Sequence, residues 1–260
     1  MPRGAAAVRP SPLRLDPTGR RLPPPLFPSH ANLQTLGHLG RAGHAHSWVV
    51  MTCSMADKEF ALSGSDQNPD LTCKNPALMA LQAHRTEAGS VRASIEHSED
   101  VVTGNRLPAL VAAMNALTPA TPLDPARVEH EVLTRDQQLL NDYGKDAQWM
   151  SVRNARAYAP ERALRIAPPH RLLDPAHGPL IALRLRPLTR KTLGGVQTTL
   201  DAQVVRPDGT AFDGLYAAGE AAGFGGGGMH GYNALEGGFL GGCVFSGHTA
   251  GRALAARELA

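Results

Sequence analysis

The sequence predicts an α+β protein in which a helix-rich part is followed by a smaller part of α/β character. Two observations lead to this prediction. Between residues 29 and 165, apolar side chains recur three and four positions apart, which is the spacing of amphipathic helices. After Pro168 and Pro169 the apolar residues alternate with a period of two, as in strands, and a last helical pattern follows a glycine-rich loop.

The helix-rich part contains four segments with helical spacing, and two of them also carry start signals. Asp124 can accept hydrogen bonds from free amides, and Pro125 is tolerated in a first helical turn. Residues 103–105 supply the other start signal. The expected helices are residues 31–39, 76–84, 106–117 and 125–141.

The part after residue 178 reads as strands separated by turns. Residues 206–210 (Arg-Pro-Asp-Gly-Thr) predict a turn, because Pro restricts φ and Gly adopts positive φ without strain. A terminal helix is expected over residues 233–259. The expected strands are residues 180–185, 195–199, 202–205 and 214–219.

Composition excludes several classes of protein. With 260 residues, 42% of them hydrophobic, the chain can form one large domain or two small ones. The 26 Lys and Arg against 23 Asp and Glu leave a net charge of only +3, which does not indicate a nucleic-acid partner. No apolar stretch approaches the length of a membrane span. The three cysteines are Cys53, Cys73 and Cys243, whose wide spacing predicts neither a disulfide framework nor a zinc site, so a cytoplasmic location is expected.

Residues 1–28 differ from the rest in composition, with five Arg, eight Pro and one acid. An Arg-rich, acid-poor segment can be a transit peptide, but this density of Pro disfavours the amphipathic helix that such peptides form. Residues 13–22 alternate around Asp16-Pro17-Thr18-Gly19, which predicts a small hairpin.

The glycine-rich loop of residues 223–228 is the first indication of a binding function. It formally satisfies G-x-G-x-x-G, but only about 30 residues follow it, too few for the remainder of a dinucleotide-binding unit. We interpret it instead as a backbone cradle, since glycines let main-chain amides approach a flat or anionic ligand. The alternative is a flexible linker.

The residues on both sides of this loop resemble a known family. Four stretches are similar to the carboxy-terminal segment of the fumarate reductase and 3-ketosteroid dehydrogenase flavoproteins: residues 214–220 (Gly-Leu-Tyr-Ala-Ala-Gly-Glu), residues 230–238 (His-Gly-Tyr-Asn-Ala-Leu-Glu-Gly-Gly), and the pairs Gly241-Gly242 and Ser246-Gly247. The Thr-Leu-Gly-Gly turn of residues 192–195 is similar to a turn of the same family. Within that family the FAD-binding dehydrogenases have stretches similar to residues 58–70 and 167–173. The resemblance implies FAD as cofactor and covers nearly the whole chain.

The resemblance also implies a division of the chain. Residues 1–28 form the Pro- and Arg-rich segment, residues 29–178 a substrate-binding cap-like domain, and residues 179–260 the closing segment of an FAD domain. The amino-terminal Rossmann βαβ unit of the family has no counterpart in the sequence before residue 29. A truncated protein, or one whose amino-terminal half is supplied by another chain, is therefore expected.

Several residues take cofactor-binding roles by resemblance. Glu220, preceded by Gly219, matches the acid that accepts hydrogen bonds from flavin ribityl or ribose hydroxyls; the alternative is a surface acid at a helix start. Backbone amides of residues 234–240 match those that face the isoalloxazine ring. The expected cofactor-binding residues are Gly219, Glu220, Ala234, Leu235, Gly237, Gly238, Phe239 and Leu240.

The catalytic positions differ from those of the fumarate reductases. Ala234 stands where these enzymes have Arg, and Lys191 where they have His, so a dicarboxylate substrate is not expected. The positions that polarise the substrate carbonyl in the steroid dehydrogenases match Phe224 and Gly228, which keep the backbone amide but not the hydroxyl. We therefore list Tyr232, His230 and Lys191 as candidate catalytic residues, with packed or solvated side chains as the alternative.

The implied function is hydride transfer between FAD and a CH–CH or C=C bond next to a carbonyl, with a steroid- or enone-like small molecule as substrate. The rival hypotheses are a non-catalytic remnant or interaction domain that binds no FAD, and one half of a split flavoenzyme. A homo-oligomer is also compatible with the sequence. The histidines near Cys53 (His38, His44 and His46) have no standard structural-zinc spacing, so no metal site is expected.

Overall fold

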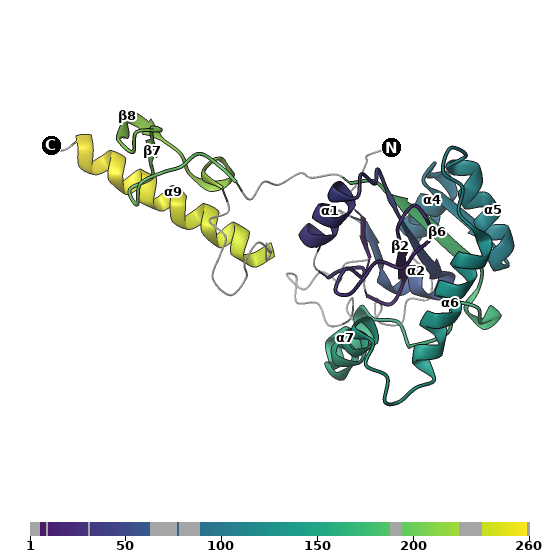
Figure 1. The fold of residues 1–260 in the computed structure, drawn as a ribbon. Helices are drawn as coiled ribbons and strands as arrows, with labels where there is room; N and C mark the ends of the chain where they lie inside the picture. Colours follow the sequence, from purple (N-terminus) through teal and green to yellow (C-terminus); the bar gives the residue numbers. More distant parts are fainter. Residues whose placement is uncertain are drawn as a thin grey trace. The chain divides into compact units, whose positions relative to one another are not determined.

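A computed structural model of the chain describes residues 6–8, 10–30, 32–62, 77, 89–187, 194–223 and 236–258. The chain divides into two compact units, Met1–Pro187 and Leu188–Ala260, which we call the first and second unit. The first unit extends past the expected boundary at residue 178, because strand β6 (Leu180–Leu185) pairs with strands of that unit. Figure 1 shows the elements of each unit.

The first unit is built on a four-stranded antiparallel sheet with the order β2-β3-β6-β5. In its centre β3 pairs with β6, from Ser47 opposite Leu185 to Thr52 opposite Leu180. Leu15 and Arg21 also form an antiparallel bridge, so the chain reverses over residues 16–20. The strands are β2 (Leu13–Leu15), β3 (Ser47–Thr52), β5 (Val101–Gly104) and β6, and a separate antiparallel pair joins β1 (Ala6–Val8) to β4 (Phe60–Leu62).

The helices of the first unit begin at residues whose side chains accept hydrogen bonds from free amides. Asp124 caps α6 through the Ala126 amide, and Asp146 caps α7 through the Trp149 amide. Helices α5 and α6 lie along one side of the sheet (Figure 1). The helices are α1 (Asn32–Arg41), α2 (Cys53–Glu59), α4 (Gly89–His97), α5 (Leu107–Leu117), α6 (Pro125–Leu139), α7 (Ala147–Ala157), α8 (Ala159–Leu164) and the 3-10 turn η1 (Pro175–His177).

The hydrophobic core of the first unit lies between the sheet and these helices. Strand β3 is buried along its whole length, and Trp48 is fully enclosed. Helix α5 contributes Leu110 and Met114, and α6 contributes Val128 and Val132, all without solvent exposure. Burial of this extent accounts for most of the favourable free energy of folding of such a unit.

Buried polar side chains hold residues 10–12, which lead into β2. Glu59 accepts a hydrogen bond from the Ser11 amide at 3.0 Å, and Arg135 donates to the Ser11 carbonyl at 2.9 Å. Gln148 donates to the carbonyls on either side of Ser11. The three side chains are at most 1% exposed, so they replace water as partners for this backbone.

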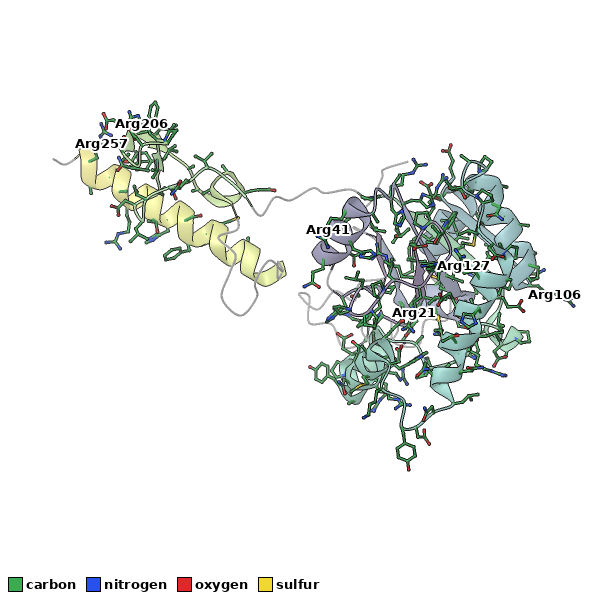
Figure 2. The ribbon with its side chains drawn as sticks, viewed as in Figure 1. Arg21, Arg41, Arg106, Arg127, Arg206 and Arg257 are labelled. Carbon is green, nitrogen blue, oxygen red and sulfur yellow. The ribbon has the colours of Figure 1, made fainter. Side chains whose placement is uncertain are left out.

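The second unit is smaller and contains a hairpin, a short turn and a long helix. Strands β7 (Gln203–Val205) and β8 (Ala211–Tyr216) pair antiparallel. The 3-10 turn η2 (Gly219–Ala222) follows β8, and helix α9 runs over Glu236–Glu258. Figure 2 labels Arg206 and Arg257 in this unit, where Arg257 pairs with Asp213 at 2.5 Å and holds the pKa of that carboxyl below its usual value.

Several predicted elements are confirmed and two are corrected. Helices α1, α5, α6 and α9 lie where the periodicity predicts them, whereas the expected helix 76–84 falls almost wholly outside the described residues. Residues 195–199 do not form a strand; only Thr198 makes a bridge, to Val204. The strand expected over 214–219 begins at residue 211, because the turn of residues 206–210 brings the next residue directly into register with β7.

The structure contains both helices and strands, in agreement with the mixed class that the sequence predicts. All strand pairs among the described residues are antiparallel. No helix in the described parts of the chain has the length and apolar character required to cross a membrane.

Candidate functional site

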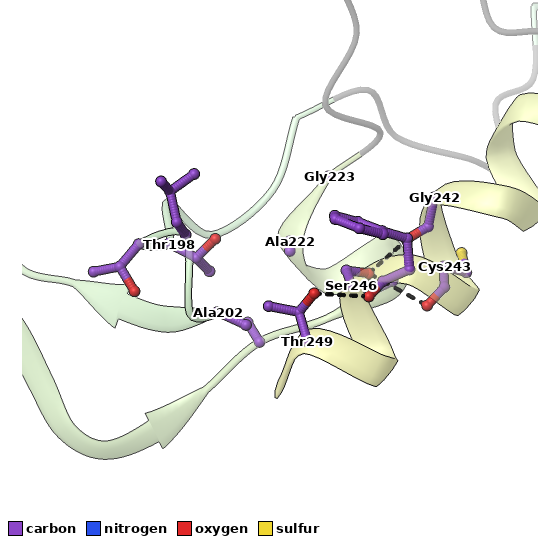
Figure 3. Close-up of a pocket in the computed structure, with 13 residues that line it drawn as sticks. Thr198, Ala202, Ala222, Gly223, Gly242, Cys243, Ser246 and Thr249 are labelled. Carbon is purple, nitrogen blue, oxygen red and sulfur yellow. Dashed lines mark hydrogen bonds between the residues drawn. The ribbon is translucent and has the colours of Figure 1, made fainter. Parts of the chain in front are cut away.

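The second unit contains a cavity of about 500 Å³ between three segments of the chain (Figure 3). The loop before β7 contributes Thr198 and Ala202, the turn after β8 contributes Gly219 and Gly223, and helix α9 contributes a row of small side chains. Glycine, alanine and hydroxyl side chains therefore form most of the wall that Figure 3 labels, which leaves main-chain groups accessible to a ligand.

Gly195, the last residue of the Thr-Leu-Gly-Gly stretch, lies against the backbone of the turn after β8. A Cβ atom on Gly195 would lie 2.0 Å from the Gly223 nitrogen, so no larger residue fits at this position. The Val196 amide donates to the Ala221 carbonyl at 2.8 Å in the same region. Two glycine-containing turns that are far apart in the sequence thus contact each other through their backbones. The predicted cradle of residues 223–228 lies outside the described residues except for Gly223 and stays a prediction.

The turn that carries Gly219 and Glu220 has backbone angles that favour glycine. Gly219 has φ +63° and Gly223 has φ +81°, both in the region that residues with a Cβ rarely adopt. The Gly223 amide donates to the Glu220 carbonyl at 3.0 Å and closes the 3-10 turn. The Gly219 amide donates to the Ser246 hydroxyl of α9 at 2.9 Å, so the turn is attached to the helix.

Glu220 lies on η2 with its side chain exposed. A carboxylate on this exposed turn can accept hydrogen bonds from ligand hydroxyls. The structure is therefore compatible with the predicted ligand-binding role of Glu220, and equally with a surface acid.

The amino-terminal end of α9 coincides with the stretch expected to face a flavin. The described part of the helix starts at Glu236, so Gly237, Gly238 and Phe239 lie in the first turn that the structure describes, and Leu240 follows with 68% of its surface exposed. Amides toward the amino-terminal end of a helix lie at the partially positive end of the helix dipole. This end of α9 is therefore suited to an electron-rich ligand atom.

Of the predicted site residues, the structure brings Gly219 next to α9 and places Gly237 to Leu240 on that helix. Glu220 lies on the same turn as Gly219. The other predicted residues lie outside the described part of the chain, and their roles stay predictions: Lys191, Phe224, Gly228, His230, Tyr232, Ala234 and Leu235. Among the described residues, no group of three or more His, Cys, Asp or Glu side chains is arranged to hold a metal ion.

The sequence assigned no role to the side chains of α9 that line the cavity, although Ser246 belongs to the stretches that carry the family resemblance. Cys243 and Ser246 are one turn apart and both reach the Gly219 turn. The available signal was the spacing of small residues by three and four positions along the terminal helix, a pattern that tight helix packing also produces.

Proteins of known families match most of this chain. The family profile described as FAD binding domain matches residues 4–240. A KsdD-like steroid dehydrogenase of Mycobacterium tuberculosis is 53% identical over 247 residues, which cover 95% of this chain and 44% of that protein. A KsdD-like steroid dehydrogenase of Mycolicibacterium smegmatis is 51% identical over 231 residues, covering 89% and 42% respectively.

Among solved structures, the 3-ketosteroid delta1-dehydrogenase from Sterolibacterium denitrificans shares the fold, with a TM-score of 0.58 and 16% identity. The match covers 95% of this chain and 39% of that one. This chain thus spans less than half the length of the curated relatives that it matches.

The profile match extends over most of both units, and it includes the Gly195 and Gly219 turns. The resemblance predicted from the glycine motifs is confirmed. FAD is the cofactor of these proteins. The chain belongs to the FAD-binding family of flavoprotein oxidoreductases that includes the ketosteroid dehydrogenases and fumarate reductases.

Proposed function

We propose that this chain forms part of an FAD-dependent dehydrogenase that acts on a CH–CH or C=C bond next to a carbonyl, with a steroid-like ketone as substrate. The observation that supports this most directly is the 53% identity to a KsdD-like steroid dehydrogenase over 95% of the chain. Identity at this level over both units favours a shared substrate class over a shared fold alone.

The described residues fit FAD through their backbone more than through their side chains. Gly219 and Gly223 leave main-chain groups open to the cavity, Glu220 would accept hydrogen bonds from ribityl or ribose hydroxyls, and the first turn of α9 would direct its amides at the isoalloxazine ring. When bound, FAD supplies the hydride acceptor or donor. The role of the protein is to orient the ring and to favour its anionic reduced form by these amides.

The residues that would handle the substrate belong to the glycine-rich loop and the turn before Val196. Tyr232 or His230 would exchange a proton with the substrate, and Lys191 is the third candidate. The Gly228 amide would polarise the carbonyl beside Phe224. Because Ala234 has no charge with which to hold a carboxylate, a neutral ketone is favoured over a dicarboxylate.

The proposed enzyme includes more than this chain, because the chain spans only 44% of the length of its Mycobacterium tuberculosis relative. Apolar side chains of the second unit are exposed, with Leu200 at 97%, Phe245 at 73% and Val244 at 66%. Such a surface is typical of a protein interface. We propose an amino-terminal flavoprotein half as its partner, with a second copy of this chain as the alternative.

The test is the visible absorbance of flavin in protein purified with added FAD, followed by acid release and quantification of the flavin. We expect stoichiometric flavin, and weaker binding in Glu220→Gln than in the matched variant Asp208→Asn, whose carboxylate lies in the β7–β8 turn. Ketosteroids and enones would then be screened as electron donors and acceptors. A folded chain that takes up no flavin, alone or with an added flavin-binding half, contradicts the proposal and leaves a non-catalytic role.

A further inference from the structure

Ser246 connects helix α9 to the turn that carries Glu220. Its hydroxyl donates to the Gly242 carbonyl, one turn earlier on α9, at 2.8 Å. A serine hydroxyl has one hydrogen and two lone pairs, so this bond aims a lone pair away from the helix. The Gly219 amide donates to that lone pair at 2.9 Å, across 27 positions of sequence.

This hydrogen bond determines which way the peptide between Ala218 and Gly219 faces. In a trans peptide the N–H and C=O groups point in opposite directions, so an amide directed at α9 turns the Ala218 carbonyl away from it. Gly219 itself has φ +63°, where glycine meets little resistance to rotation. The glycine therefore permits the turn, and the Ser246 hydroxyl selects one orientation of it.

Cys243 packs beside Gly219 without specifying the direction of its amide. A Cβ atom on Gly219 would lie 3.6 Å from the Cys243 sulfur, which is an ordinary van der Waals contact distance. Such a contact has little directional preference, whereas the hydrogen bond to Ser246 requires the Gly219 N–H to point at the hydroxyl.

We infer that Ser246 is a positioning residue for the cofactor, which holds the Gly219 turn so that the next residue, Glu220, presents its carboxylate to the FAD hydroxyls. This inference rests on the proposed FAD-binding function. Ser246 acts through Gly219 and Glu220 and needs no contact of its own with the ligand.

The test compares three variants of the full chain by amide hydrogen exchange, FAD affinity and urea unfolding. In Ser246→Ala we expect the Gly219 amide to exchange about tenfold faster and FAD to bind about tenfold more weakly, which corresponds to the loss of one hydrogen bond. Ser246→Thr keeps a hydroxyl, so the exchange rate of the Gly219 amide and the FAD affinity should both be those of the wild type. Thr249→Val removes a hydroxyl that donates to the Phe245 carbonyl of the same helix, and should leave the exchange of Gly219 unchanged.

Two results would overturn the inference: Gly219 exchange that is the same in Ser246→Ala as in the wild type, or faster exchange with FAD affinity unchanged. A loss of FAD affinity that merely follows a lowered urea midpoint, and that Ser246→Thr does not rescue, would assign Ser246 a structural role instead. If the wild-type chain binds no FAD, the proposed function fails for the chain alone, whereas the exchange of Gly219 in Ser246→Ala still decides whether Ser246 orients the turn.

Discussion

The two units of this protein bury their side chains in different ways. In the first unit, Trp48, Leu110 and more than a dozen other apolar side chains form one continuous core, crossed by fully buried polar groups such as Arg135. In the second unit, the buried apolar residues among those described are Ala202 and Ala250, while Leu200 and Phe245 are largely exposed.

This difference separates a unit that specifies its own fold from one whose surface is suited to ligands and partners. A core of large, interdigitated side chains favours a single packed state. Small residues and glycine turns leave backbone groups accessible, but they contribute little apolar burial. We therefore expect the first unit to respond to mutation through its stability and the second unit through binding.

The largest effect should come from breaking the buried polar network of the first unit. Arg135 is fully buried, pairs with Asp136 at 2.6 Å, and donates to the carbonyls of Ser11 and His170. Arg135→Ala should lower the free energy of unfolding by about 3–5 kcal/mol, because a buried charge and buried carbonyls lose their partner. Both tryptophans lie in this unit, so urea unfolding followed by tryptophan fluorescence reports on it alone.

The matched control is Arg153→Ala, which removes an exposed guanidinium that donates to the carbonyls of Asn141 and Asp142. We expect a change of about 1 kcal/mol or less, as for exposed polar contacts. If Arg135→Ala and Arg153→Ala lower the free energy of unfolding by the same amount, the buried polar network contributes no more to the stability of the first unit than an exposed contact does.

The next effect is a pH dependence from Glu59. Burial raises the pKa of Glu59 from 4.5 to about 7. Between these values the folded protein keeps a proton that the unfolded chain has released, so the contribution of Glu59 to stability is full below pH 4.5 and is lost as the pH rises to about 7. The loss is on the order of 3 kcal/mol at about 1.36 kcal/mol per pH unit.

Urea unfolding of the wild type and Glu59→Gln between about pH 4.5 and 8 measures this contribution. Burial lowers the pKa of His170, which therefore removes stability as the pH falls, in the direction opposite to Glu59. The His170 contribution is common to both proteins and cancels in their difference. If the difference in free energy of unfolding between the wild type and Glu59→Gln stays constant over this pH range, the pKa of Glu59 is not raised by burial.

In the second unit, the strongest structural effect is expected at Gly195. A Cβ atom there overlaps the backbone of Gly223, so Gly195→Ala must displace the turn and should destabilise it by about 1–3 kcal/mol. Hydrogen exchange of the Val196 amide, which donates to Ala221, measures this displacement. Gly241→Ala is the control, because a Cβ atom on Gly241 meets no atom within 4 Å and alanine favours the helix.

The smallest effect on stability is expected on the exposed apolar surface of the second unit. Val244→Lys should change the free energy of unfolding by about 0.5 kcal/mol or less, and should reduce self-association in sedimentation velocity experiments. The same change in the first unit, Val128→Lys, places a charge in the core and should prevent stable folding. A large loss of stability in Val244→Lys would show that the second unit packs this side chain internally, which would remove the contrast between the units.

Local signals in the sequence predicted the elements that depend on neighbouring residues. Helix α6 begins after Asp124 and Pro125 as expected, because the cap and the proline act within one turn. Strand β3 was missed, since Ser47–Thr52 is buried on both faces and shows no alternation. Residues 195–199 alternate but form only one bridge, at Thr198, because alternation does not supply a pairing partner.

The sequence by itself determined the family and its cofactor, because the order of the glycine motifs around Gly195, Gly219 and residues 223–228 is readable without coordinates. Only the tertiary structure decided what supports those motifs. Ser246 reaches Gly219 across 27 positions, and Glu59 reaches Ser11 across 48. Propensities act over a few residues, whereas such contacts exist only once packing has brought distant segments together, so no local pattern encodes them.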